Sequence, residues 1–154
     1  MIILINAFLN ENFVQEDDEM SKKYVMGNGA IALGALSAGV NLVSGYPGTP
    51  SSEIIETVAK FPHEGTYLEW SVNEKAAMEV AAAAAYCGAR AMVTMKQVGL
   101  NVASDPLMSL AYVGVKGGMV VVAADDPGPI SSQTEQDTRR FAEFARIPVF
   151  DPSS

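Results

Sequence analysis

Apolar and polar positions along this chain recur with two periods, one typical of amphipathic helices and one of short buried strands. The helical period predicts helices over residues 30–38, 50–61, 73–87, 100–115 and 132–145. Short apolar runs predict strands over residues 41–46, 67–70, 90–95, 119–124 and 147–150. This regular alternation of strands and helices predicts an α/β fold built on a doubly wound parallel sheet.

The first residues do not fit this alternation. The run MIILINAFL is too short to span a bilayer, and it lacks the basic region and cleavage site of a signal peptide. Residues 10–22 are polar and acidic, and Met20 to Lys23 look like a natural start. We therefore expect residues 1–21 to be an extension and linker outside the fold, and residues 22–154 to form one domain. No membrane partner is indicated, and a cytoplasmic location is the default.

Length and composition limit the classes of function. A chain of 154 residues suits one domain, and 49% hydrophobic with 18% charged residues suits a buried sheet covered by helices. The net charge of −8 without a basic cluster excludes a nucleic-acid surface. The single cysteine, Cys87, cannot form an internal disulfide or a CxxC metal site.

One carboxylate stands where a predicted strand runs into a predicted helix. The strand 67–70 is followed by Ser71, and Glu74 comes three residues later. This spacing is a capping box, and an acid at this position also stabilises the helix dipole. The carboxyl ends of strands in open α/β sheets are also where ligands bind, and a lone acid there suits a hydrogen bond to a ring nitrogen of a cofactor. Both interpretations stay open on these residues alone.

A second turn of this kind follows the strand 41–46. Its Pro47 and Gly48 form a tight turn, in which the glycine allows a ligand to approach the backbone. Thr49 is suited to cap the next helix and Pro50 to begin it. A well-built strand–helix turn explains the pattern without any ligand. The Lys-Ser/Thr ending of a P-loop is missing, and no GxGxxG opens a strand–helix unit.

Five strings taken together resemble the amino-terminal domain of the large subunit in the 2-oxoacid:ferredoxin oxidoreductase family, nearest to its indolepyruvate branch. The strings, in chain order, are GNGAIALGALSAG, SGYPGTPSSE, NEKAAMEVAAAAAYCGARA, MKQVGLNVASDPL and ADDPGPISSQTEQDTR. The resemblance extends from about Lys22 to Ser154, which is nearly the whole chain. It implies the pyrimidine-binding domain type of thiamine-diphosphate enzymes.

The resemblance also implies roles for individual residues. Glu74 would hydrogen-bond the pyrimidine ring nitrogen of thiamine diphosphate and so be the catalytic residue of this chain. Pro47, Gly48 and Thr49 would complete the cofactor site, and Thr49 would also lie near the substrate. The implied activity is oxidative decarboxylation of a 2-oxoacid, with ferredoxin as electron acceptor. No metal ligand is implied in this chain.

One departure from the family concerns the substrate. Pyruvate-specific relatives carry an arginine in the loop after the strand equivalent to 119–124, where this chain has Asp125 and Asp126. The difference favours a bulkier aryl-pyruvate, such as indolepyruvate. Lys96, at the end of strand 90–95, is then the candidate that meets the substrate carboxylate. A solvated lysine at a strand end is the alternative.

Some parts of the family pattern are missing from these residues. The chain has no GDG…N motif for diphosphate and Mg²⁺ and no cysteine-rich segment for iron–sulfur clusters, so both are expected on parts absent from it. We therefore expect a separate diphosphate-binding domain or subunit, an oligomeric enzyme, and an isolated chain without activity. Two alternatives are the equivalent domain of another thiamine enzyme, such as a 2-oxoacid decarboxylase, and a non-catalytic interaction domain of the same fold.

Overall fold

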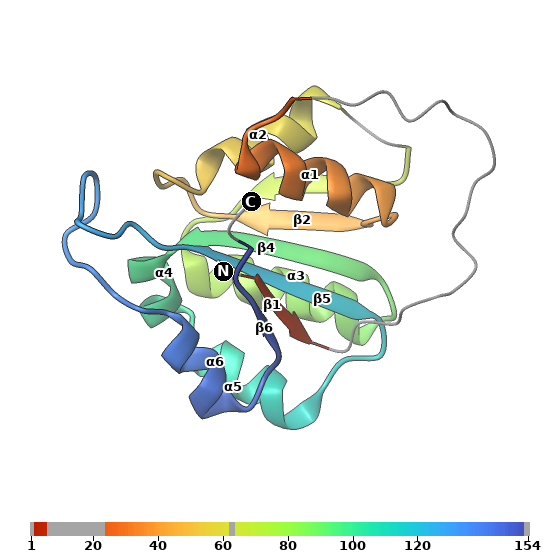
Figure 1. Ribbon diagram of the computed structural model, residues 1–154. Helices are drawn as coiled ribbons and strands as arrows, with labels where there is room; N and C mark the ends of the chain where they lie inside the picture. The colour runs from red at the N-terminus through yellow and green to blue at the C-terminus, as the bar shows by residue number, and fades with distance from the viewer. Residues whose placement is uncertain (1, 6–23, 62–63, 153–154) are drawn as a thin grey trace.

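The computed structural model describes residues 2–5, 24–61 and 64–152 of the chain (Figure 1). These residues form six strands and six helices. The strands are β1 (Ile2–Ile5), β2 (Leu42–Gly45), β3 (Tyr67–Trp70), β4 (Arg90–Lys96), β5 (Gly118–Ala124) and β6 (Val149–Phe150). The helices are α1 (Gly27–Ser37), α2 (Ser52–Lys60), α3 (Glu74–Tyr86), α4 (Gln97–Val102), α5 (Ser104–Val113) and α6 (Arg139–Ala145).

All six strands join one sheet in the order β3-β2-β4-β5-β1-β6. The first four of these pair in parallel, which confirms the predicted α/β class. Strand β4 is central, with Val93 level with Ser44 of β2 and with Val121 of β5. Because β4 is covered on both faces, residues 91–95 are all buried.

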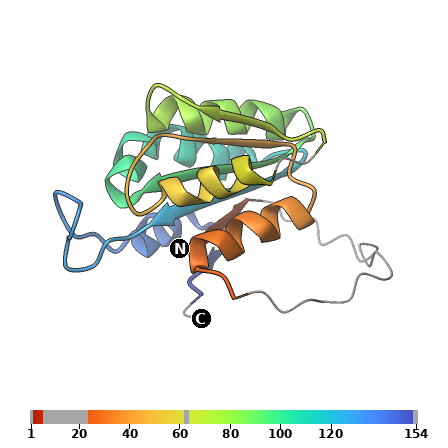
Figure 2. The same cartoon turned by 90° about the horizontal axis from the view of Figure 1, so that it is seen from above.

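Helices cover both faces of the sheet (Figure 2). Helices α1 and α2 pack on one face around a core that includes Val43, Ile54 and Met92. Helices α3, α4, α5 and α6 lie on the other face around a second core that includes Met78 and Leu107. The alanine-rich α3 contacts β2, β4 and β5, and its small side chains allow it to lie close to the sheet. The Ser44 hydroxyl donates to the Ala77 carbonyl at 2.8 Å across this contact.

The expectation that residues 1–21 lie outside the fold is wrong for Ile2–Ile5. This segment forms β1, which pairs antiparallel with β5 on one side and with β6 on the other. The physical reason is that β5 would otherwise end the parallel sheet with an unpaired edge, and a short apolar segment satisfies it. The remaining part of that extension, residues 6–21, lies outside the described residues.

Helix α1 begins at Gly27 rather than at residue 30, and three other predicted helices differ from the structure by two residues or more. The helix expected from residue 50 begins at Ser52, because the Gly48 carbonyl accepts from the backbone N–H groups of both Ser51 and Ser52 in a preceding turn. The helix expected over 100–115 is two helices, α4 and α5, which meet at Ala103.

The third difference concerns the stretch before α6. The helix expected over residues 132–145 does not begin at Ser132, and α6 begins only at Arg139. The backbone N–H groups of residues 130, 131 and 132 instead donate to the side chain of Asp126, and that of Thr138 donates to Asp125. Side chains close in sequence thus compete with the helix for these donors.

Strand β1 gives a direct test of the corrected domain boundary. Ile3 is paired with Val121 on one side and with Val149 on the other. Ile3→Pro should lower the free energy of unfolding by more than about 2 kcal/mol, because proline removes a ladder donor and leaves its partner unsatisfied. Urea unfolding followed by circular dichroism measures this change. Ile3→Val is the control. A proline variant as stable as the wild type would show that residues 2–5 lie outside the fold after all.

Candidate functional site

The candidate site lies at the carboxyl edge of the parallel strands, on the left in Figure 1. Four connections meet there because parallel strands all end at the same edge. They are the turn 46–51 after β2, residues 71–73 after β3, the start of α4 after β4, and the loop 125–138 after β5. Pro47, Gly48 and Thr49 lie in the first of these connections, Glu74 begins the helix after the second, and Lys96 is the last residue of β4.

Glu74 is the first residue of α3 and does not take part in a capping box. The N-cap of α3 is Asn73, whose side-chain oxygen accepts from the Ala76 N–H at 2.8 Å. The Ser71 hydroxyl donates instead to the Glu69 carboxylate at 2.7 Å, and the Ser71 N–H donates to the Gly45 carbonyl at 2.9 Å. Ser71 therefore continues the sheet, which leaves Glu74 without a capping partner.

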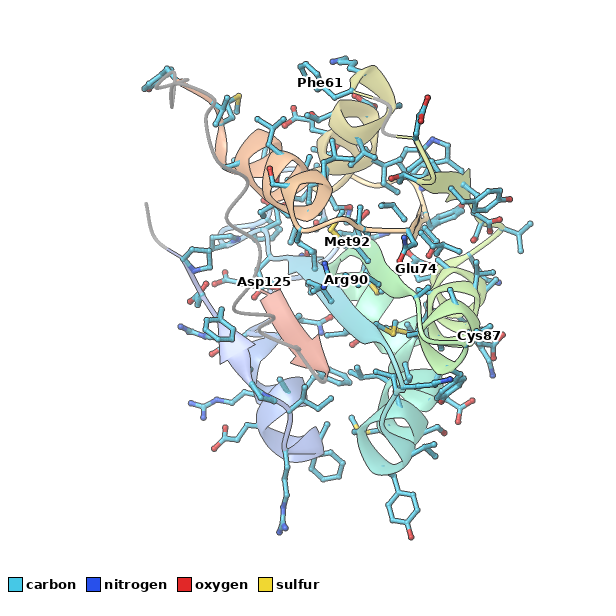
Figure 3. All side chains as sticks on the ribbon, turned by 90° about the vertical axis from the view of Figure 1, so that its right-hand side faces the viewer. Phe61, Glu74, Cys87, Arg90, Met92 and Asp125 are labelled. Carbon is cyan, nitrogen blue, oxygen red and sulfur yellow. The ribbon has the colours of Figure 1, made fainter. Side chains whose placement is uncertain are left out.

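The Glu74 side chain packs against the backbone of α4 (Figure 3). A Cβ atom added to Gly99 would lie 2.6 Å from both Cγ and Oε1 of Glu74. Gly99 thus permits the close approach of a half-buried carboxylate. Among the described residues, Glu74 forms no hydrogen bond or ion pair, so its carboxylate is held in place by packing and by the helix start.

The turn after β2 presents Thr49 to the surface. Thr49 is exposed and precedes Pro50. The N-cap of α2 is Ser51, so Thr49 is not the cap that the sequence predicted. Gly48 lies under the Lys96 side chain, since an added Cβ would be 2.9 Å from Lys96 Cδ. The Gly48 N–H donates to the Ser52 hydroxyl at 2.8 Å, which closes the turn.

Among the described residues at this edge, Lys96 has the only cationic side chain that forms no ion pair. Its side chain crosses Gly48, and Nζ donates to the Ser131 carbonyl at 3.3 Å. By contrast, the Arg139 guanidinium is paired with Asp137 at 2.7 Å and with Asp151 at 3.0 Å. Lys96 therefore keeps a positive charge that no described carboxylate neutralises, next to the turn that carries Thr49.

The two aspartates after β5 hold the loop 125–138 in place. Asp125 accepts from the backbone and hydroxyl of Thr138. Asp126 is buried and accepts from the backbone N–H groups of Ser131 and Ser132 at 3.0 Å and of Ile130 at 3.2 Å. The Ser131 N–H is the main cause that lowers the pKa of Asp126, while burial opposes it. Both carboxylates are thus engaged within the loop.

Several residues at this edge were not singled out from the sequence. Gly99 is the wall against which Glu74 packs, and Ser131 contacts both Lys96 and the Thr49 carbonyl. The Gln97 amide is buried and donates to the Thr134 carbonyl at 2.9 Å. These residues lie within the strings MKQVGLN and ISSQTEQ, which are part of the family resemblance. The strings do not indicate which residues contact each other.

Three further observations concern the described part of the chain. A hollow of about 480 Å³ opens beside the site on the α1 side, lined in part by Asn28, Pro50 and Asp125. It does not include Glu74. In the ranges that the structure describes, no group of three or more His, Cys, Asp and Glu residues could hold a metal ion. No helix formed by those residues is long and apolar enough to cross a membrane.

Comparisons with known proteins agree on one family. Residues 33–137 match the family described as pyruvate flavodoxin/ferredoxin oxidoreductase, thiamine diphosphate-binding. The indolepyruvate oxidoreductase subunit IorA of Archaeoglobus fulgidus is 51% identical over 148 residues, which cover 93% of this chain and 24% of that protein. IorA of Pyrococcus horikoshii is 52% identical over 90% of this chain and 22% of that protein.

A more distant relative and a solved structure extend this result. The ketoisovalerate oxidoreductase subunit VorB of Methanothermobacter thermautotrophicus is 32% identical over 71% of this chain and 31% of its own length. The 2-oxoglutarate:ferredoxin oxidoreductase of Magnetococcus marinus, solved with 2-oxoglutarate, coenzyme A and succinyl-CoA bound, aligns with a TM-score of 0.54 at 28% identity. That alignment covers 56% of this chain and 15% of the other. The chain spans about a quarter of the length of the IorA proteins it matches.

The start of α3 can be tested without any ligand. Asn73→Ala should lower the free energy of unfolding by about 1 kcal/mol, because the Ala76 N–H loses its cap. Ser71→Ala should cost clearly less, since Ser71 is not the cap. Urea unfolding of both variants compares them, and the reverse order would restore the Ser71–Glu74 capping box.

Asp126 should make stability depend on pH in acid. Because its folded-state pKa is lowered, its ionised form stabilises the fold above about pH 4, and this contribution is lost as pH falls through the folded-state pKa. The difference in melting temperature between the wild type and Asp126→Asn should be constant at pH 5–6 and shrink below about pH 4. A difference that stays the same down to pH 2 would contradict this role.

Proposed function

The chain belongs to the pyruvate flavodoxin/ferredoxin oxidoreductase family, and we propose that it is the pyrimidine-binding side of a thiamine-diphosphate-dependent 2-oxoacid:ferredoxin oxidoreductase. One observation carries this proposal most strongly. Glu74 holds a half-buried carboxylate at the carboxyl edge of the sheet, with no hydrogen-bond partner among the described residues. A carboxylate without a structural partner in such a place is available to a ligand.

The residues at this edge fit the aminopyrimidine ring of the cofactor. A ring nitrogen needs a group that can share a proton with it, and the Glu74 carboxylate is such a group. Packing against Gly99 limits the positions that this carboxylate can take. When bound, thiamine diphosphate supplies the nucleophilic carbon for decarboxylation of a 2-oxoacid, and the protein supplies placement and electrostatics.

We assign the neighbouring residues by their positions at the same edge. Pro47 and Gly48 shape the turn that faces the cofactor, and the exposed Thr49 hydroxyl is turned toward the substrate. Lys96 is the candidate for the substrate carboxylate, because its charge is not neutralised by a described acid and it lies over Gly48. Asp125 and Asp126 are engaged within their own loop and are not candidates.

We propose an aryl-pyruvate, indolepyruvate in particular, as the substrate. The relatives named for indolepyruvate are 51% and 52% identical to this chain, whereas the relative named for ketoisovalerate is 32% identical. The two aspartates after β5 support the same choice, because pyruvate-specific relatives carry an arginine at this place. Thr49 and Lys96 would then recognise the 2-oxoacid end that all these substrates share.

The complete reaction requires parts beyond this chain. We propose that a diphosphate-binding domain or subunit supplies the Mg²⁺ site, that iron–sulfur clusters lie on other parts of the enzyme, and that ferredoxin takes the electrons. We further propose that the enzyme is oligomeric and cytoplasmic, and that the isolated chain is inactive.

Glu74→Gln tests the proposal. Glutamine keeps the size of the side chain but cannot exchange a proton with a ring nitrogen. Decarboxylation of indolepyruvate by the assembled enzyme should fall by roughly 10²-fold or more. The cost in stability should stay within about 1 kcal/mol, since only a charge near the helix start is lost.

Glu79→Gln is the matched control. Glu79 lies on the same helix, is exposed, and is 3.9 Å from Lys75 in a surface ion pair. It should change neither turnover nor the melting temperature appreciably. Near-normal turnover in Glu74→Gln, with both variants folded, would show that Glu74 is not the catalytic group of the proposed site.

A further inference from the structure

The turn that carries Thr49 is held from outside by two donors on distant parts of the chain. The Pro50 carbonyl accepts from the Asn28 amide at 2.8 Å, and the Thr49 carbonyl accepts from the Ser131 hydroxyl at 3.0 Å. Asn28 lies in the first turn of α1 and Ser131 in the loop after β5. Two successive carbonyl groups of the turn are therefore fixed by residues that are 22 and 82 positions away.

Asn28 has the side chain that this position requires. Its amide nitrogen also donates to Oε2 of Glu53 at 3.0 Å, in the first turn of α2. A primary amide is a neutral group with two donors on one nitrogen, so it can serve the Pro50 carbonyl and the Glu53 carboxylate together. Asn28 thereby connects α1 with both the turn and the helix that follows it.

Two hydrogen bonds of its backbone fix the position of Ser131, in addition to the one that its hydroxyl donates to Thr49. Its backbone N–H donates to Asp126 at 3.0 Å, and its carbonyl accepts from Lys96 Nζ at 3.3 Å. Its hydroxyl lies 3.0 Å from the Thr49 carbonyl and 3.4 Å from Asp126, so Thr49 is the nearer acceptor. The loop after β5 thus contacts Thr49 and Lys96, the two residues proposed to meet the substrate.

The Thr49 side chain is left unengaged by this arrangement. Thr49 is exposed, and its hydroxyl forms no hydrogen bond within the described part of the chain. We propose that Asn28 and Ser131 are positioning residues that fix the Thr49–Pro50 backbone, so that the Thr49 hydroxyl meets the 2-oxoacid in one orientation. This inference rests on the proposed function for the role of Thr49, but the backbone clamp itself does not.

Hydrogen exchange on the 154-residue chain tests the clamp without any ligand. The N–H groups of Gly48, Ser51 and Ser52 are all bonded within the turn. Asn28→Ala and Ser131→Ala should each speed their exchange by about 3-fold or more, because each removes a hydrogen bond that fixes the turn. Ser131→Thr keeps the hydroxyl and should restore slow exchange.

Asn101→Ala is the matched control for the loop. Asn101 and Gln136 exchange two amide hydrogen bonds, at 2.7 and 3.0 Å, which also tie the loop 125–138 to the rest of the domain. Loss of Asn101 should loosen the loop but leave exchange at residues 48–52 unchanged. Equal effects of Asn101→Ala and Ser131→Ala on the turn would overturn the clamp. If Asn28→Ala does not fold, the Ser131 series decides alone.

Kinetics of the assembled enzyme test the consequence for Thr49. Asn28→Ala and Ser131→Ala should each lower kcat/KM for indolepyruvate by about 10-fold, through a hydrogen bond lost from the positioning of Thr49. In a Thr49→Ala background the same substitutions should cost almost nothing further, because they act through the residue already removed. Full additivity with Thr49→Ala would overturn the positioning role.

The two proposals fail in different ways. If Glu74→Gln turns over normally, the proposed function fails while the exchange results on the turn still stand. If Glu74→Gln is inactive but Ser131→Ala shows normal exchange and normal kcat/KM, only the clamp is wrong.

Discussion

The parallel pairing of β4 with β2 and β5 is the constraint on which the other features depend. It buries both faces of the central strand, so each face requires its own helical layer. It also brings the ends of β2, β3, β4 and β5 to one edge, and Thr49, Glu74 and Lys96 all lie at that edge. The site is therefore a consequence of strand direction, and no single segment of the chain could form it alone.

Acidic residues serve two separate purposes at this edge. Asp125 and Asp126 accept hydrogen bonds from the loop that follows them. These bonds order a polar stretch that has no apolar core of its own. Glu74 is held by a helix start and by contact with Gly99, and it keeps its hydrogen-bonding capacity. The difference between a structural and an available carboxylate lies in the donors around it, which residue type alone does not indicate.

The same loop also connects the separate parts of the site. Ser131 touches Thr49 and Lys96, Gln97 reaches Thr134, and Asn101 pairs with Gln136. These bonds join the strand ends of β2, β4 and β5 through side chains. Ser131 thus couples the positions of Thr49 and Lys96, whereas the bonds of Gln97 and Asn101 hold the loop itself.

The sequence by itself determined the alternation of strands and helices after residue 27, the limits of β3, and the place of Glu74 at a strand–helix junction. Apolar period and turn residues are local properties, and they suffice for these features. Only the tertiary structure decided which residue caps α3, because Ser71 is held in the sheet by the Gly45 carbonyl and Asn73 takes its place. The same holds for β1, which depends on an open edge of β5, and for Thr49, whose carbonyl is bound by Ser131 from 82 positions away. Contacts between segments far apart in sequence leave no periodic signal, so they appear only when the chain is folded.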